Sequence, residues 1–362
     1  MELRAISTYA HELKQVLPRD AFAPDPWPLL RLPLHLGIIV VSMIAIRAHL
    51  VPWPIALVLS LVIGVSFAAL TFLGHETLHD AVTRNHVARY LVGFIGFLPF
   101  VVSPRLWIAW HNRIHHPHAN QPGIDPDAAP TLGEYRASAR IRFVVDHLAL
   151  GRRSVTGWLS LLIGFSVQSV HVLFSAGRRR YLSPSQHALA VAETLLGVAL
   201  WAGLFVLVGP RAFLLVFVLP LVVANAIVLS FIITNHGLSP LTTINDPLVN
   251  SLSVTVPRFV DWLTLNFGAH VEHHLFPTMA SRHFALLGQL VRERWPERYQ
   301  SLSFLDAIAR LHRTGRVYKD DITLCDPRTG KEWLALLPGM AQPDAVHDPA
   351  QRAASHQADS RK

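Results

Sequence analysis

The sequence predicts an all-α integral membrane protein with four transmembrane helices in two hairpins and a cytoplasmic helical cap. The first evidence for a membrane protein is the composition. Hydrophobic residues make up 51% of the 362 residues and charged residues only 15%, whereas soluble domains carry roughly 25% charge. Several apolar stretches are also long enough to cross a bilayer, which takes about 20 residues of helix. Backbone polar groups inside a bilayer must pair within their own segment, so these stretches are expected to be helices.

Four stretches are predicted to span the membrane. They are residues 32–50, 54–73, 188–208 and 212–233. Residues 51–53 alone separate the first pair, and residues 209–211 alone separate the second pair. Connections this short predict two tight helical hairpins.

Two further apolar stretches are expected not to cross. Tyr90–Val102 is too short and contains Gly93, Gly96 and Pro99. Residues 155–174 are long enough, but they carry the polar residues Ser160, Ser166, Gln168, Ser169 and His171. If the three histidine clusters described below share one site, a crossing at 155–174 would put the third cluster on the wrong side. We therefore expect this stretch to lie in the membrane interface or against the bundle.

The distribution of arginine predicts the orientation. Twelve arginines lie between Asp80 and His187, whereas the hairpin tips carry only Arg47 and Arg211. Because positive residues stay on the cytoplasmic side, both termini and all three histidine clusters are expected to be cytoplasmic. The basic residues mostly flank apolar runs, so the net charge of +8 does not indicate a nucleic-acid partner.

The ends of the chain are expected outside the membrane. Residues 1–31 form a cytoplasmic segment that lacks the pattern of a cleavable signal peptide. The membrane domain covers residues 32–277, and residues 278–339 are expected to form cytoplasmic helices, at Arg282–Arg294 and Phe304–Arg313. Residues 340–362 are predicted to be a disordered tail.

Three histidine clusters carry the chemistry. They read HETLH, HNRIHH and HVEHH, and their histidines are His75, His79, His111, His115, His116, His270, His273 and His274. Residues three and four apart share one face of a helix, so each cluster presents several imidazoles together. Imidazole is the commonest transition-metal ligand near neutral pH, and eight are too many for one ion. The sequence therefore predicts two metals.

Other residues could complete this site. His236, at the cytoplasmic end of the fourth span, is a ninth candidate ligand. His118 follows Pro117, which breaks the helical register, so we do not expect it to be a ligand. Carboxylates and amides that could orient a ligand or hold a metal-bound water are Glu76, Asp80, Asp125, Asp261, Glu272, Asn112, Asn235 and Asn266.

The ligand type limits which metals could bind. Nitrogen-only sites suit zinc, copper, iron or nickel. The single Cys325 excludes an iron–sulfur or Cys-based zinc site. Eight or nine imidazoles give two ions four or five protein ligands each, which leaves open positions and favours catalysis over a structural site.

With these residues in view, the chain resembles the membrane fatty acid desaturase and hydroxylase superfamily from about Leu32 to Pro277. The three boxes occur in the superfamily's order, and the segment NFGAHVEHHLFP is similar to the acyl-lipid desaturase branch. The resemblance implies a non-haem di-iron oxidase that activates O2 and introduces a double bond into a membrane lipid acyl chain. It also implies that the eight box histidines bind two iron ions, with His236 as a further ligand. An Asn that holds water in some members, four residues before this His, is Ile232 here.

The source of electrons and the reaction type are separate questions. We find no flavin motif and no haem-domain signature, so a separate ferredoxin-like or small haem protein is expected to supply electrons. A hydroxylase or ketolase acting on a fatty acid, sphingolipid, carotenoid or alkane is the alternative within the superfamily. A zinc-binding membrane transporter or receptor is the alternative from another class, although transporter sites lie near mid-bilayer and these boxes lie outside the predicted spans.

Overall fold

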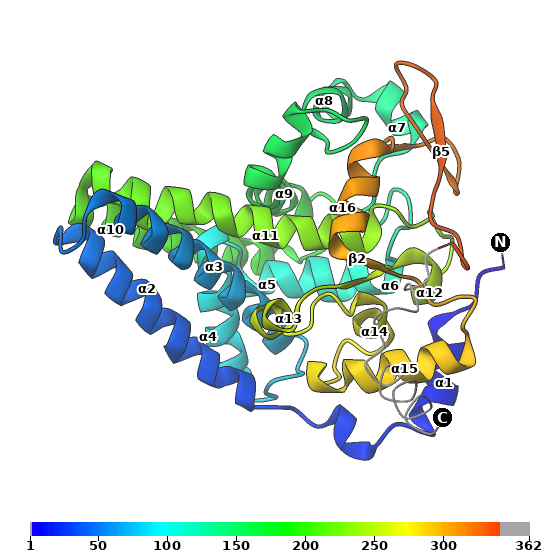
Figure 1. The fold of residues 1–362 in the computed structure, drawn as a ribbon, viewed down its shortest axis with the longest axis horizontal. Coiled ribbons are helices and arrows are strands. Elements are labelled where there is room, and N and C mark those ends of the chain that lie inside the picture. The colour runs from blue at the N-terminus through cyan, green and yellow to red at the C-terminus, as the bar shows by residue number, and fades with distance from the viewer. Residues whose placement is uncertain (1, 341–362) are drawn as a thin grey trace, which may run out of the picture.

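Helices dominate the computed structural model, which describes residues 2–340. The long helices are α2 (Arg31–Arg47), α3 (Trp53–Leu78), α9 (Leu159–Ala176), α10 (Pro184–Phe213) and α11 (Leu219–His236). In Figure 1, α2, α3, α10 and α11 extend to the left, and the shorter helices and the strands gather to the right. The predicted tail, apart from Met340, lies outside the described residues.

Four segments of the described chain are long and apolar enough to cross a membrane. They are Trp27–Arg47, Trp53–Leu78, Thr156–Ala176 and Pro184–His236. The last contains two predicted spans, since α10, the π-helical turns η7 (Leu214–Val218) and α11 follow one another without a loop. The backbone breaks within it at Gly209, where φ is 79°. The segment 156–176 passes the same requirement, so length and composition do not separate it from the spans.

Helix α3 is central because it contacts α2, α11 and α4 (His86–Phe97). Glycines allow the close approach. A Cβ at Gly64 would lie 2.6 Å from the Cβ of Val223, and a Cβ at Gly96 would lie 2.5 Å from the carbonyl oxygen of Leu70. Small residues at such contacts let helix backbones pack directly. These contacts fix the last turns of α3, where the first histidine cluster lies.

The chain bends sharply before the second cluster. The segments His86–Phe100 and Pro104–His118 meet at 95°. They contain α4, the 3-10 turn η3 (Leu98–Phe100), α5 (Pro104–Trp107), the π-helical segment η4 (Ile108–His115) and α6 (His116–His118). Ser103 caps α5 by accepting hydrogen bonds from the backbone N–H groups of Arg105 and Leu106. The bend places the second cluster beside the end of α3.

The remaining helices are short. They are α1 (Ile6–Lys14), η1 (Arg19–Phe22), η2 (Trp27–Leu30), α7 (Leu132–Ala137), α8 (Ala139–Phe143), η5 (Val144–Leu148), η6 (Thr156–Trp158), α12 (Pro247–Asn250), α13 (Arg258–Thr264), α14 (His270–Leu275), η8 (Ser281–His283), α15 (Phe284–Arg294) and α16 (Phe304–Arg313). The two helices predicted after residue 277 are confirmed as η8 with α15, and as α16.

The structure also contains two small sheets that the sequence did not predict. A parallel pair joins β1 (Ser253–Thr255) and β2 (Ser301–Ser303), and an antiparallel sheet joins β3 (Val317–Tyr318), β4 (Thr323–Cys325) and β5 (Glu332–Leu334). The all-α prediction is therefore correct for the helical bulk and incomplete for these strands. Strands of two or three residues are too short to show an alternating pattern.

Candidate metal centre

Five elements bring the histidines together. The first cluster lies at the end of α3, and the second lies in η4 and α6 after the bend. The third cluster forms α14, and His236 is the last residue of α11. All nine candidate histidines are buried.

Their ring nitrogens form two groups that could each hold a metal ion. The larger group contains five histidines, and the smaller contains four. In each group, one nitrogen from every ring lies within 4.8 Å of all the others. The five-histidine group is His75, His79, His111, His116 and His273, and the four-histidine group is His115, His236, His270 and His274.

The division between the groups differs from the helical expectation. The i, i+4 pair His111 and His115 is split, and His111 instead joins His116, five residues later. The cause is the π-helical geometry of η4, in which the backbone N–H of His116 donates to the carbonyl of His111. A π-helix has more residues per turn, and such segments often occur at functional sites. The second cluster therefore contributes to both groups.

The spacing of the ring nitrogens fits metal coordination. Metal–nitrogen bonds of about 2.0–2.1 Å place neighbouring ligand nitrogens roughly 2.9–3.4 Å apart. The Nε2 atom of His111 lies 2.9 Å from that of His75 and 3.2 Å from that of His116. The Nε2 atoms of His236 and His270 lie 2.8 Å apart. A neutral imidazole has a single N–H, so hydrogen bonds alone cannot satisfy several nitrogens that converge on one point.

Ring nitrogens without a hydrogen-bond partner also indicate metal coordination. Neither ring nitrogen of His274 has a hydrogen-bond partner within the described residues, and neither does Nε2 of His79. Burial, followed by the neighbouring imidazoles, holds the pKa of His116 and of His274 well below the ordinary value. The rings of His116 and His274 are therefore neutral, which is the form that binds metals.

Carboxylates lie against the outer nitrogens of both groups. The Oε1 atom of Glu76 lies 3.2 Å from Nδ1 of His75 and 3.8 Å from Nδ1 of His273. On the other group, Nδ1 of His115 lies 3.0 Å from Asp125 Oδ1 and 3.4 Å from Asp127 Oδ2. Burial lowers the pKa of His115, but the two carboxylates outweigh it and raise the pKa to about 9. Such contacts fix the orientation of a ligating ring.

Asp127 was missed in the sequence, and a different signal could have found it. It stands two residues after Asp125 in the Pro/Asp/Gly-rich loop that follows the second cluster. Loops of this composition turn sharply, so neighbouring carboxylates can face the same ring.

Three predicted carboxylates lie elsewhere. Glu272 accepts hydrogen bonds from Ser253 Oγ at 2.6 Å and from Tyr299 OH at 2.7 Å. Asp80 pairs with Arg89, and no contact of the Asp261 side chain with a histidine is found among the described residues. On α14, Glu272 lies two residues from both His270 and His274, so its side chain points to the opposite side of the helix. The predicted roles of these three residues near the metals are therefore not supported by the geometry.

The remaining predicted candidates are three amide side chains and His118. Asn112 donates to the carbonyl of Leu78, and Asn266 donates to that of Ser281. Asn235 is buried, and its side-chain atoms have no hydrogen-bond partner within the described residues. His118 bonds Gln121 and belongs to neither group, as expected.

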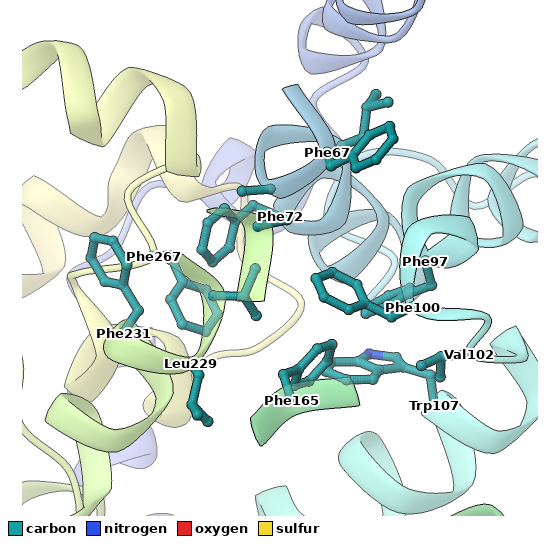
Figure 2. Packing of buried hydrophobic residues seen from close by; sticks show 14 of the residues in the cluster. Phe67, Phe72, Phe97, Phe100, Val102, Trp107, Phe165, Leu229, Phe231 and Phe267 are labelled. Atoms are coloured by element: carbon teal, nitrogen blue, oxygen red, sulfur yellow. The ribbon is translucent and has the colours of Figure 1, made fainter. Parts of the chain in front are cut away.

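An apolar cavity borders both groups. Its free volume is about 20 Å³, and histidines from both groups line it, among them His75 and His236. Figure 2 shows rings from two sides, with Phe72 and Phe267 on one and Phe97, Trp107 and Phe165 on the other. The ring of Trp107 stacks on His111 with 4.4 Å between centroids. An aromatic wall therefore lies directly against histidines of both groups.

Apolar helices of membrane-spanning length, with two buried histidine groups beside an apolar cavity, are the features of a membrane protein with a candidate metal centre. Residues 52–305 match the model of the fatty acid desaturase family, and the chain belongs to this family. The resemblance inferred from the three boxes is thereby confirmed.

Curated relatives are distant but cover most of the chain. A protein of Synechocystis sp. named sn-1 oleoyl-lipid 12-desaturase is 22% identical over 78% of this chain and 81% of its own length. A protein of the same name from Picosynechococcus sp. is 21% identical over 79% of this chain and 83% of its own. A chloroplastic omega-6 fatty acid desaturase of Spinacia oleracea is 21% identical over 65% of this chain and 53% of its own.

Proposed function

We propose that the protein is an O2-dependent di-iron desaturase that introduces a double bond into the acyl chain of a membrane lipid. The observation that carries the proposal is the pair of histidine groups at one apolar cavity. Two iron ions would supply the activation of O2 and the removal of two hydrogens from adjacent carbons. The balanced reaction consumes one O2, two electrons and two protons for each double bond and releases two waters.

The residues of the chain have distinct parts in this reaction. The five-histidine group would hold one iron and the four-histidine group the other, so all eight box histidines and His236 are proposed ligands. Glu76 would hold His75 and His273 in place, and Asp125 would hold His115. The aromatic cavity walls would position the acyl chain and exclude water, which protects reactive intermediates from side reactions.

The relatives support an acyl-lipid substrate. Two are named for the desaturation of an oleoyl lipid, and a third for an omega-6 fatty acid. The aromatic wall beside the histidines suits a hydrocarbon chain, but hydroxylation or ketone formation would need the same wall and the same metals. The hydroxylase or ketolase is therefore the second candidate.

We also propose that both histidine groups face the cytoplasm, below two hairpins formed by α2 with α3 and by α10 with α11. The arginine distribution supports this orientation. Contacts of α9 agree with it. Trp158, just before α9, lies 5.2 Å from the ring of His312 in α16, and His187 in the first turns of α10 donates to the carbonyl of Leu173 near the end of α9. Both ends of α9 then lie on the cytoplasmic side, and α9 does not cross.

Electrons would come from a separate ferredoxin-like or small haem protein. The basic cytoplasmic surface that the orientation predicts suits an acidic carrier. Turnover with such a carrier should fall as salt is raised, at fixed substrate concentration. Turnover that is independent of salt would contradict docking by charge.

The decisive experiment is lipid analysis. The chain would be expressed in a host with saturated membranes and a ferredoxin system, and fatty-acid methyl esters would be compared with those of a His115→Ala variant. A new unsaturated ester that is absent from the variant supports the proposal and locates the double bond. An oxygenated product would replace the proposal by the hydroxylase. One zinc per chain and no iron, in protein made with ample iron, would favour the transporter or receptor.

A further inference from the structure

A polar side chain of α9 reaches the metal centre indirectly. Gln168 lies in α9, a mostly apolar helix, and its Nε2 donates to Oδ1 of Asp127 at 2.5 Å. Trp110 Nε1 donates to the same oxygen at 3.1 Å. Two donors from separate elements thus hold one carboxylate in a fixed orientation. This explains a polar residue that the membrane prediction left without a role.

The other oxygen of Asp127 faces a proposed ligand. Oδ2 lies 3.4 Å from Nδ1 of His115, whose nearer acceptor is Asp125 at 3.0 Å. Asp125 is itself held, because its oxygens accept from the backbone N–H groups of Asn120 and Asp127. His115 therefore has a fixed acceptor already, and Asp127 adds a second negative charge to the same ring.

Such an arrangement is costly unless it is compensated. The side chain of Asp127 is only 7% exposed, and a buried carboxylate without partners strongly destabilises a fold. The donors Gln168 and Trp110 supply that compensation. A carboxylate kept beside another carboxylate, with dedicated donors, indicates a role beyond stability.

Asp127 also stands between the two groups. One of its oxygens, one nitrogen of His111 and one of His115 lie within 4.8 Å of one another. His111 belongs to the five-histidine group and His115 to the four-histidine group. The same carboxylate lines the cavity, so it lies where the metals and the acyl chain would meet.

We propose that Asp127 is a positioning residue, held by Gln168 and Trp110, that orients His115 and strengthens it as a ligand of the four-histidine group. A negative charge on the far nitrogen of an imidazole makes the near nitrogen a stronger donor to a metal. The inference rests on the proposed di-iron function. Asp127 should act on one metal more than on the other, because it contacts His115 directly and approaches the five-histidine group only at His111.

Spectroscopy of the resting, iron-loaded full-length protein tests this inference without turnover. Gln168→Met removes the amide donor but keeps the length of the side chain, and Trp110→Phe removes the indole N–H but keeps a ring against Phe165. Ser169→Ala is the matched control, because Ser169 is buried in the same helix and its hydroxyl, among the described residues, donates only to Phe165 O in its own helix, at 2.8 Å. Iron per chain and the Mössbauer spectrum are measured for each protein.

We expect two irons in every protein. Gln168→Met and Trp110→Phe should alter the same one of the two spectral components, Asp127→Asn should alter it further, and Ser169→Ala should leave both unchanged. Where Asp127→Asn fails to insert, the two donor variants decide alone. A change in kcat with little change in KM for Gln168→Met supports positioning, whereas a change confined to KM would assign Asp127 to substrate contact.

The inference and the proposed function can fail separately. Wild-type spectra in all variants, with two irons bound, would overturn the positioning role and leave the di-iron function intact. A wild-type protein that binds no iron would overturn both.

Discussion

His236 and His270 bring their Nε2 atoms to 2.8 Å from each other although they lie 34 residues apart, at the end of α11 and the start of α14. The other nitrogen of His236 donates to the carbonyl of Asn250 at 2.9 Å. This hydrogen bond fixes the tautomer and turns Nε2 toward the four-histidine group. A residue at the end of an apolar span thereby becomes part of the site.

The first prediction concerns His236. His236→Ala should lower iron from two ions per chain toward one and abolish desaturation, because it removes one of only four rings in its group. His118→Ala is the control, since His118 belongs to neither group and bonds Gln121. Iron analysis of purified protein gives the readout. Two irons in His236→Ala would exclude His236 as a ligand.

The second prediction contrasts two glutamates beside the boxes. Glu76→Gln should lower metal affinity by about 10–100-fold, the usual effect of losing a carboxylate behind a ligating ring, because Glu76 faces His75 and His273. Glu272→Gln should instead cost stability, by about 1–3 kcal/mol, because its amide cannot accept from both Ser253 and Tyr299. Metal titration and thermal unfolding in detergent separate the two effects. Equal metal loss in both variants would contradict the assignment.

The third prediction tests the contact of α3 with α4. Gly96→Ala should destabilise the protein by about 1–3 kcal/mol, the typical cost of overpacking, because its Cβ would lie 2.5 Å from the carbonyl oxygen of Leu70. Gly37→Ala is the matched control, since nothing lies within 4 Å of its Cβ. It should be neutral or stabilising, because Ala favours helix more than Gly. The thermal midpoints of the two variants are compared in one detergent. Equal midpoints would show that α3 and α4 can move apart without loss of stability.

The sequence predicted the site better than its internal arrangement. Apolar runs and His-x-x-x-His spacing are local features, so the apolar helices and all nine histidines were visible in it. The division of His111 from His115 depends on a π-helical segment, which no residue type marks. Asp127 reaches His115 only because the loop after the second cluster folds back, and a loop conformation depends on tertiary contacts.

The predicted role of Glu272 did not agree with the structure for a related reason. Proximity in sequence to the third cluster suggested proximity in space, but Glu272 lies two residues from both His270 and His274, on the opposite side of α14. Glu272 therefore points to Tyr299. Asp261 and Asp80 show the same limit, because being near a box in sequence did not bring their side chains to it.

The fourth prediction concerns the cavity wall. Phe165 is fully buried and lines the cavity, whereas Phe174 on the same helix is 71% exposed. Phe165→Leu should change the distribution of chain lengths among the unsaturated products, because it enlarges the space beside the metals. Its cost in stability should stay below the roughly 3–5 kcal/mol of a Phe→Ala change in a core. Phe174→Leu should leave the products unchanged, and identical product profiles in both variants would place the acyl chain elsewhere.

The last prediction uses pH to test the position of Asp261, which lies in α13 outside the spans. Burial raises the pKa of this carboxyl from 3.8 to about 6. Below the ordinary value both the folded and unfolded forms are protonated, and burial costs nothing. As pH rises toward 6 the unfolded chain ionises first, so the fold loses stability, and above 6 it carries the full cost of a half-buried charge. Asp261→Asn should therefore raise the thermal midpoint at about pH 8 and not at about pH 4.

Asp20→Asn, which changes an exposed side chain, is the control. A gain from Asp261→Asn that is equal at both pH values would mean that the charge of Asp261 is not buried.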